Sequence, residues 1–265
     1  MSEQYTKLVK HKFIKKHIWK LWYWIVSFQD KSSEVKFMNY GFSGGKAPEL
    51  LPEDEQERYP LQLYDYLVSG VDLAGKKVLE VGCGRGGGSH YIARYYKPEM
   101  FTGLDISSKA VKYCRSQYKE PNLMHIQGDA QHLPFPSGSF DVVINVESSH
   151  CYPNISRFYK EVARVLKPEG LFLYTDLRNQ GNIQHFHDCL NEAPLVKQRY
   201  EIITSNVLEA LDKDSARRVD IVERIGPRFL KETAYTFAGV KNSPTYQKFV
   251  TGWFVYFMCT LRKKD

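Results

Sequence analysis

The chain has 265 residues, of which 43% are hydrophobic, so it can bury one sizeable core and needs no second domain. Its five cysteines are odd in number, widely spaced and without a C-x-x-C pair, which argues against a disulfide framework or a zinc site and fits a reducing cytoplasm. Much of the net charge of +7 comes from lysines and arginines near the two ends, so no broad nucleic-acid surface is predicted.

Residues 1–60 precede the first strand of the expected core. Within them, Leu8–Phe28 mixes lysines with aromatic and branched residues, and its apolar positions partly follow a helical period. We therefore expect a helix there. The apolar run is short, is interrupted by Lys20 and is not followed by a small-residue cleavage pattern, which argues against a signal peptide or a transmembrane helix.

From Lys76 onward, strand-like and helix-like segments alternate, as expected for a parallel sheet with helices on both faces. The expected strands are 77–82, 101–106, 123–129, 140–147 and 171–177, and the expected helices between them are 88–96, 107–118 and 155–166. After these, residues 180–228 have the composition of a polar, helix-rich insertion. Two β-rich segments, 232–240 and 249–261, are expected to close the sheet as a hairpin around Asn242-Ser243-Pro244.

The first strand runs into a glycine-rich turn, Gly82-Cys83-Gly84-Arg85-Gly86-Gly87-Gly88, and Asp105 ends the second strand. Glycine allows backbone to approach a ligand closely and permits the positive φ of a tight turn. A carboxylate after the second strand can accept hydrogen bonds from a ribose diol. This pattern indicates a nucleoside cofactor, with a nicotinamide dinucleotide still open at this point.

Five ordered motifs resemble the successive motifs of class I S-adenosylmethionine-dependent methyltransferases. They are Glu80–Gly86, Gly103–Asp105, Gly128–Ala130 with Leu133-Pro134-Phe135, Phe140–Val143 and Arg164–Gly170. A nicotinamide-binding domain has no reason to carry the last three. The resemblance implies an α/β, Rossmann-like fold with a seven-stranded, mostly parallel sheet, helices on both faces and helical caps at the N-terminus and at 180–228.

Stretches 19–42, 73–81 and 145–153 are also similar to the mycobacterial phthiotriolone and phenolphthiotriolone dimethylcocerosate methyltransferases, which O-methylate a hydroxyl on a long lipid. The similarity becomes loose over 179–245. It implies an N-terminal helical lid over 1–60, a methyltransferase domain over 61–265 and a substrate cap at about 180–228. The acceptor it implies is small and hydrophobic, such as a lipid or polyketide, and a C-methyltransferase of sterol or quinone type is the alternative.

The resemblance also implies which residues hold S-adenosylmethionine. They are Glu80, Gly82, Cys83, Gly84, Asp105, Ile106, Asp129, Ala130, Asn145 and Val146. The first four are expected at the methionine end, the next two at the ribose and adenine, Asp129 and Ala130 at the adenine edge, and the last two under the methionyl portion. No histidine shows a metal-ligand spacing, so no metal is expected.

A hydroxyl must lose its proton as it accepts a methyl group. His150, just beyond the fourth strand, is the best-placed general base, and Asp176, at the end of the fifth strand, is expected to orient it. Glu147 is a third candidate, for which contact with cofactor or substrate is an equal alternative.

The candidate acceptor-binding residues are Trp22, Tyr40, Phe42, Glu147, His150 and His185. The N-terminal helix is expected to close over the acceptor as a lid that excludes water. A basic helix with tryptophans can also lie on an anionic membrane, and the two roles are compatible. The chain is thus expected to be cytoplasmic, with possible peripheral membrane contact and no nucleic-acid partner, and its oligomeric state is left open.

Overall fold

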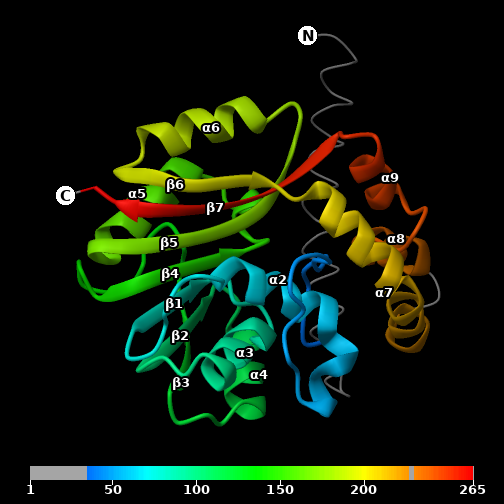
Figure 1. Ribbon diagram of the computed structural model, residues 1–265, viewed down its shortest axis with the longest axis horizontal. Coiled ribbons are helices and arrows are strands. Elements are labelled where there is room, and N and C mark those ends of the chain that lie inside the picture. The colour runs from blue at the N-terminus through cyan, green and yellow to red at the C-terminus, as the bar shows by residue number, and fades with distance from the viewer. Residues whose placement is uncertain (1–34, 227–229, 265) are drawn as a thin grey trace.

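A seven-stranded sheet runs through the protein in the order β3-β2-β1-β4-β5-β7-β6 (Figure 1), in a computed structural model that describes residues 35–226 and 230–264. The strands are β1 (Lys77–Val81), β2 (Met100–Asp105), β3 (Leu123–Gln127), β4 (Phe140–Val146), β5 (Leu166–Asn179), β6 (Leu195–Ile202) and β7 (Phe254–Lys263). Strands β1 to β5 pair in parallel, whereas β7 runs antiparallel to both β5 and β6. The expected mostly parallel, Rossmann-like sheet is confirmed.

Helices cover both faces of this sheet. They are η1 (Pro52–Glu57), α2 (Arg58–Val68), α3 (Gly87–Tyr95), α4 (Ser108–Gln117), η2 (Ser149–Cys151), α5 (Ile155–Val165), α6 (Ile183–Glu192), α7 (Thr204–Ile225), α8 (Lys231–Ala238) and α9 (Pro244–Val250). Because side chains alternate along a strand, Val78 packs in a core with α2, α3, α7 and α9, while its neighbour Leu79 packs with α5 and α6.

The five central strands lie where the sequence predicts them, with small shifts at their ends. The Ser107 hydroxyl caps α4 by accepting the Ala110 N–H at 3.3 Å, as the sequence suggests. The largest shift is in β5, which begins at Leu166 instead of Leu171 and continues to Asn179. This extension keeps Asp176 inside the strand and adds Arg178 two residues later on the same face.

The predicted cap at 180–228 is wrong in its bounds. Residues 183–192 form α6, which packs on the sheet with α5, and Leu195–Ile202 is an edge strand of the sheet itself. Strand β6 was missed because it is polar along most of its length and therefore lacks the alternation of a half-buried strand. Of the helices that cap the carboxyl edge, α7 lies within the predicted range, whereas α8 and α9 come after it.

The predicted hairpin around 242–244 is also wrong. Lys231–Ala238 is helix α8, and Ser243 caps α9 by accepting the Tyr246 N–H at 3.3 Å, with Pro244 in the first turn. Threonine, tyrosine and phenylalanine in this stretch favour strands on propensity alone. Serine followed by proline is instead a helix-start signal, and here that local signal agrees with the structure.

Residues 35–51, which we call the strap, connect the core to the cap. The Phe42 N–H donates to the Tyr59 carbonyl at 3.0 Å, and the Ser43 N–H donates to the Asn206 carbonyl in α7 at 3.1 Å. Further along α7, Arg218 Nη2 donates to the Asn39 carbonyl at 3.2 Å. Within the predicted lid of residues 1–60, the strap is thus extended and is followed by η1 and the start of α2, while Leu8–Phe28 and Trp22 lie outside the described residues.

None of the helices in the two described ranges combines the length and the apolarity needed to cross a bilayer.

Candidate active site

The glycine-rich turn after β1 is packed so closely that two of its positions require glycine. Gly82 has φ of +78°, and a Cβ there would lie 2.3 Å from the Ser148 hydroxyl oxygen. A Cβ on Gly88 would lie 2.0 Å from Cζ of Tyr64. The turn therefore presents bare backbone at the carboxyl edge of the sheet.

Asp105 is fixed by this turn. Its Oδ2 accepts the Gly84 N–H at 2.9 Å, and its Oδ1 accepts the Ser107 N–H at 2.8 Å. Burial raises the pKa of Asp105, and these two amide donors lower it. Because each carboxylate oxygen can accept more than one hydrogen bond, the fixed side chain keeps acceptor capacity for a diol.

The amides of Gly82 and Cys83 both donate to the Leu104 carbonyl, at 2.7 and 3.0 Å. They close the turn and are not available to a ligand. An ammonium group, such as that of a methionyl moiety, needs acceptors, so the turn suits it through backbone carbonyl groups. The contact of this turn with the cofactor stays a prediction, in which the hydrogen-bonding groups would be carbonyls.

Glu80 lies behind the turn and is completely buried. One carboxylate oxygen accepts the Tyr64 hydroxyl at 2.7 Å, and the other accepts the Ser89 hydroxyl at the start of α3. Burial raises the pKa of Glu80. In the structure Glu80 supports the turn by joining α2 and α3 to β1, and its contact with the cofactor stays a prediction.

Asn145 and Val146, at the end of β4, are buried next to the turn. Asn145 Nδ2 donates to the Val81 carbonyl and to the Ser148 hydroxyl, both at 2.8 Å. Its buried Oδ1 has no hydrogen-bond partner in the described part of the chain. An orphaned acceptor at this edge fits a site that receives a donor from a bound ligand.

The expected adenine-side residues differ in exposure. Ile106, after β2, is 71% exposed, which is unusual for a large apolar side chain and fits one that covers a ligand ring. Ala130 is buried, and Asp129 Oδ1 accepts the Gln131 N–H at 2.8 Å. Hydrogen bonding to that amide lowers the pKa of Asp129, so its carboxylate is ionised.

His150 and Asp176 are brought together as expected. The ring Nδ1 of His150 lies 2.7 Å from Asp176 Oδ1, and the His150 backbone N–H donates to Asp176 Oδ2 at 2.9 Å. Burial would lower the pKa of His150, but the charge of Asp176 outweighs it and raises the pKa well above the usual 6.5. Burial would raise the pKa of Asp176, but His150 and Arg178 hold it well below its usual range.

Three residues behind this pair were not predicted. Arg178 lies 3.0 Å from Asp176 and donates to the Ser149 hydroxyl at 2.8 Å and the Tyr174 hydroxyl at 2.7 Å. Asp176, in turn, also accepts a hydrogen bond from Ser149. The signal that could have revealed Arg178 is its spacing, since residues two apart on a strand share one face.

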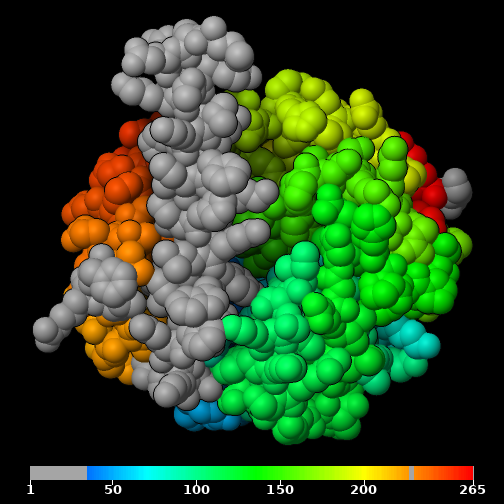
Figure 2. All heavy atoms as spheres, turned by 180° about the vertical axis from the view of Figure 1, so that it is seen from behind, coloured from blue at the N-terminus to red at the C-terminus, as the bar shows by residue number. Residues whose placement is uncertain are grey.

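A cavity of about 910 Å³ adjoins the His150–Asp176 pair. It lies among the ends of β4 and β5, helices α6, α8 and α9, and the strap; from behind, the surface is hollowed beside α6 (Figure 2). Its walls include Tyr40, His150, Arg178, His185, Phe186, Phe237, Lys248 and Phe254. The mixture of aromatic surface with a few polar groups is typical of a small-molecule site.

The predicted acceptor residues are only partly assembled around this cavity. Tyr40, His150 and His185 line it. Phe42 is buried elsewhere, stacked on Tyr66 with ring centroids 4.3 Å apart. Glu147 faces the strap and β7 through hydrogen bonds to Tyr40 and Tyr256.

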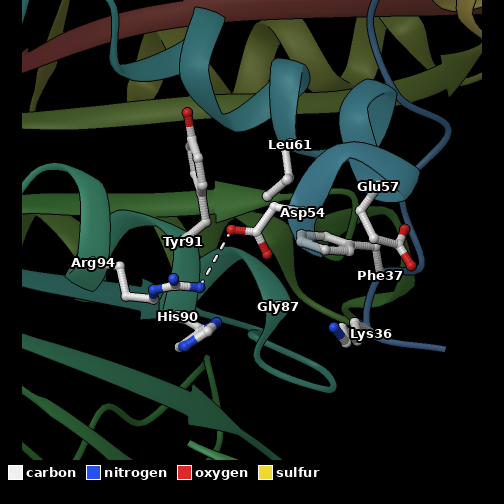
Figure 3. A pocket seen from close by; sticks show the side chains of 9 residues that line it. All are labelled: Lys36, Phe37, Asp54, Glu57, Leu61, Gly87, His90, Tyr91 and Arg94. Atoms are coloured by element: carbon white, nitrogen blue, oxygen red, sulfur yellow. Dashed lines mark hydrogen bonds and ion pairs between the residues drawn. The ribbon is translucent and has the colours of Figure 1, made fainter. Parts of the chain in front are cut away.

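A second pocket, between η1 and α3, has room for little more than one water molecule, at about 10 Å³ (Figure 3). Arg94 and Asp54 form an ion pair at 3.3 Å in its wall. It is too small to hold a substrate. Among residues 35–226 and 230–264, no group of three or more His, Cys, Asp or Glu side chains is arranged to hold a metal ion.

Comparison with known proteins identifies the family of the chain. Residues 79–174 match a family described as a methyltransferase domain. The chain is 42% identical to a fatty-acid O-methyltransferase of Mycolicibacterium smegmatis over 76% of this chain and 74% of the relative. It is 39% identical to a phthiotriol/phenolphthiotriol dimycocerosates methyltransferase of Mycobacterium tuberculosis, over 86% and 85% of the two chains.

Among solved structures, the fold is similar to geranyl diphosphate C-methyltransferase from Streptomyces coelicolor A3(2), in complex with Mg²⁺, geranyl diphosphate and S-adenosyl-L-homocysteine. The TM-score is 0.64 at 15% identity, covering 89% of this chain and 94% of that one. At this identity the similarity concerns the fold alone. The similarity to the two mycobacterial relatives extends over most of this chain and of each relative. The protein therefore belongs to the S-adenosylmethionine-dependent methyltransferases.

Proposed function

We propose that the protein transfers a methyl group from S-adenosylmethionine to an oxygen of a small, hydrophobic, lipid-like acceptor held in the 910 Å³ cavity. The observation that carries this proposal is the His150–Asp176 pair in the wall of that cavity. The names of the two relatives, one acting on fatty acids and one on phthiotriol lipids, support an apolar acceptor.

We infer that Asp105, Asn145 and the carbonyl groups of the Gly82–Gly84 turn hold the cofactor. When bound, S-adenosylmethionine supplies a methyl group on a positively charged sulfur. Asp105 is already oriented by two amides, so it is set to accept from the ribose diol without rearrangement. Close placement of the two reactants can contribute about 7–11 kcal/mol to the acceleration.

His150 is proposed to accept the proton of the acceptor hydroxyl. Because Nδ1 faces Asp176, proton transfer uses the other ring nitrogen, Nε2. The charge of Asp176 increases the proton affinity of the ring and stabilises the imidazolium that forms. Arg178 and Ser149 hold Asp176 in place, so the imidazole keeps one orientation.

The test is incubation with labelled S-adenosylmethionine and lipid, phenolic and quinone extracts, followed by mass spectrometry and NMR of the product. An O–CH₃ signal on an apolar product is the expected result. A C–CH₃ signal that resists acid would select the sterol- or quinone-type C-methyltransferase instead.

We also propose that the basic, aromatic segment 8–28 makes peripheral contact with anionic membranes and that the protein is cytoplasmic. Co-sedimentation with vesicles of phosphatidylglycerol, compared with phosphatidylcholine vesicles, tests the first part. Equal partition into both kinds of vesicle would contradict it.

A further inference from the structure

Glu147 occupies a place between the cofactor side and the acceptor side of the site, three residues before His150. Its Oε1 accepts two hydrogen bonds, from the Tyr40 backbone N–H at 2.7 Å and from the Tyr256 hydroxyl at 2.5 Å. Its own N–H donates to the Thr175 carbonyl of β5 at 3.0 Å. One side chain therefore joins the strap, β7 and the loop that carries His150.

The backbone at Glu147 is in the left-handed region, with φ of +43°. A glutamate adopts this conformation only where its surroundings enforce it, and such positions collect at functional sites. Here the carboxylate contacts with Tyr40 and Tyr256 and the backbone contact with Thr175 supply that constraint.

The electrostatic surroundings of Glu147 differ from those of Asp176. Burial raises the pKa of Glu147 to about 7, and Asp176 adds to the increase, whereas the Tyr256 hydroxyl, the Tyr40 amide and His150 oppose it. The charge of Glu147 also raises the pKa of the Tyr64 phenol of α2 and of the Tyr40 phenol of the strap. The two donors on Oε1 are both neutral groups. These surroundings suit a Glu147 side chain that acts as a hydrogen-bond acceptor for neutral donors, and not as one half of an ion pair.

Tyr40 makes this contact relevant to the acceptor. Its side chain lines the cavity, and its ring packs edge-on against Phe249 of α9 with centroids 5.4 Å apart. A Cβ on Gly239, between α8 and α9, would lie 3.0 Å from the same ring. The position of the Tyr40 backbone therefore sets the distance between the cap helices and the end of β4.

We propose that Glu147 is a positioning residue for methyl transfer: through one carboxylate oxygen it fixes the strap at Tyr40 and β7 at Tyr256 to the His150 loop, so that the acceptor wall and the base keep a constant separation. The proposal rests on the function proposed above. It assigns Glu147 no proton transfer and no direct contact with the acceptor.

The experiment compares E147Q, E147L and Y256F in the full chain. Glutamine keeps an acceptor oxygen for both donors, leucine removes it, and Y256F removes one donor only. Amide hydrogen exchange resolved to single residues by NMR reports the Tyr40 N–H separately from the bonded amides of Gly41, Phe42 and Ser43. In E147L we expect exchange there to accelerate about tenfold or more, because the N–H loses its acceptor, with little change in E147Q.

Turnover and acceptor KM are measured on the same variants. We expect E147L to lose about tenfold or more in turnover and to raise the acceptor KM, with E147Q losing much less and Y256F falling between them. Cofactor affinity, measured by calorimetry, is expected to change less than about twofold in all three, since their contacts lie away from the turn and Asp105.

Two results would overturn the proposal. Unchanged exchange of the Tyr40 amide in E147L would show that Glu147 does not hold the strap. Equal loss of turnover in E147Q and E147L, with Tyr40 still protected in E147Q, would mean that the carboxylate acts through its charge. If the wild-type protein methylated no oxygen acceptor, the proposed function would be wrong. The exchange measurement would still decide whether Glu147 holds the strap at Tyr40.

Discussion

The proposed cofactor side and the proposed acceptor side of the sheet edge are built in different ways. On the cofactor side, Gly82, Asp105 and Asn145 lie at the carboxyl ends of three neighbouring parallel strands and are fixed largely by backbone contacts. On the acceptor side, the cavity wall runs from Tyr40 to Phe254 and depends on side chains from the strap and three helices. The first side is set by the topology of the sheet, and the second by packing between distant segments.

Replacing His150 should have the largest effect on turnover. We expect H150A to lower kcat by about 10²–10⁴-fold, because the acceptor hydroxyl loses its general base. Cofactor affinity should stay within about twofold, since His150 belongs to the acceptor side. Single-turnover kinetics and calorimetry on one preparation give both values, and full turnover in H150A and H150Q would refute the base assignment.

Replacing Asp176 should shift the pH dependence. Asp176 raises the pKa of His150 above 6.5, so the wild-type rate should rise with pH through that raised value as the ring becomes neutral. In D176N the pKa of His150 should fall, the profile should move to lower pH, and the plateau should drop about tenfold to a hundredfold. A profile at the same position in both proteins would show that the pair is not coupled.

The D176N substitution should also reduce stability, because it leaves the Arg178 guanidinium buried without its counter-charge. We expect the free energy of unfolding to fall by about 3–5 kcal/mol. Asp176 has a lowered pKa, so its contribution is present above pH 3.8 and is lost as the pH falls through the lowered value. Urea unfolding at pH 7 measures the loss in free energy of unfolding. The pH–rate profiles of D176N must be recorded at a temperature below its thermal unfolding midpoint.

Replacing Asp105 should test the cofactor side alone. We expect D105A to weaken S-adenosylmethionine binding about 10–100-fold, the range for losing hydrogen bonds to a charged acceptor. Binding of a fluorescent fatty-acid probe to the cavity should not change. Unaltered cofactor affinity in D105A would contradict the proposed cofactor site, and loss of probe binding would show that the two sides are not separable.

The smallest effect is expected for His185, which lines the cavity from α6. H185A should raise the acceptor KM about two- to fivefold with kcat unchanged, as for most pocket side chains outside an energetic centre. A loss in kcat as large as that of H150A would place His185 in the chemistry and not only in binding.

The same contrast explains what the sequence could predict. Glycine, carboxylate and apolar strand patterns between 77 and 147 are local, and strands of a parallel sheet bring their carboxyl ends together whatever the helices do. The role of Arg178 could not be predicted, because it depends on folding beside Ser149 and Tyr174. The contacts of Glu80 with Tyr64 and Ser89 likewise join separate elements, and no local pattern in the sequence indicates them.

Further along the chain, local preference was a poor guide. The α8 segment is rich in strand-forming residues but packs as a helix, because the sheet already has its closing strand in β7. Strand β6 is polar because it lies at the sheet edge, where lysine and arginine discourage pairing with another chain. In both cases the deciding factor was the position in the tertiary structure.

Asp176 lies in the interior of the sheet, on a strand paired with β4 on one side and with β7 on the other, where it is opposite Phe257. Residues in such strands exchange their amide protons mainly when the whole domain unfolds. Heating should therefore release the cap and the strap before it disturbs this carboxylate. Acceptor binding should therefore be lost at a lower temperature than the one at which Asp176 is displaced from His150. Because the sheet is still folded at that point, mild thermal inactivation should be reversible.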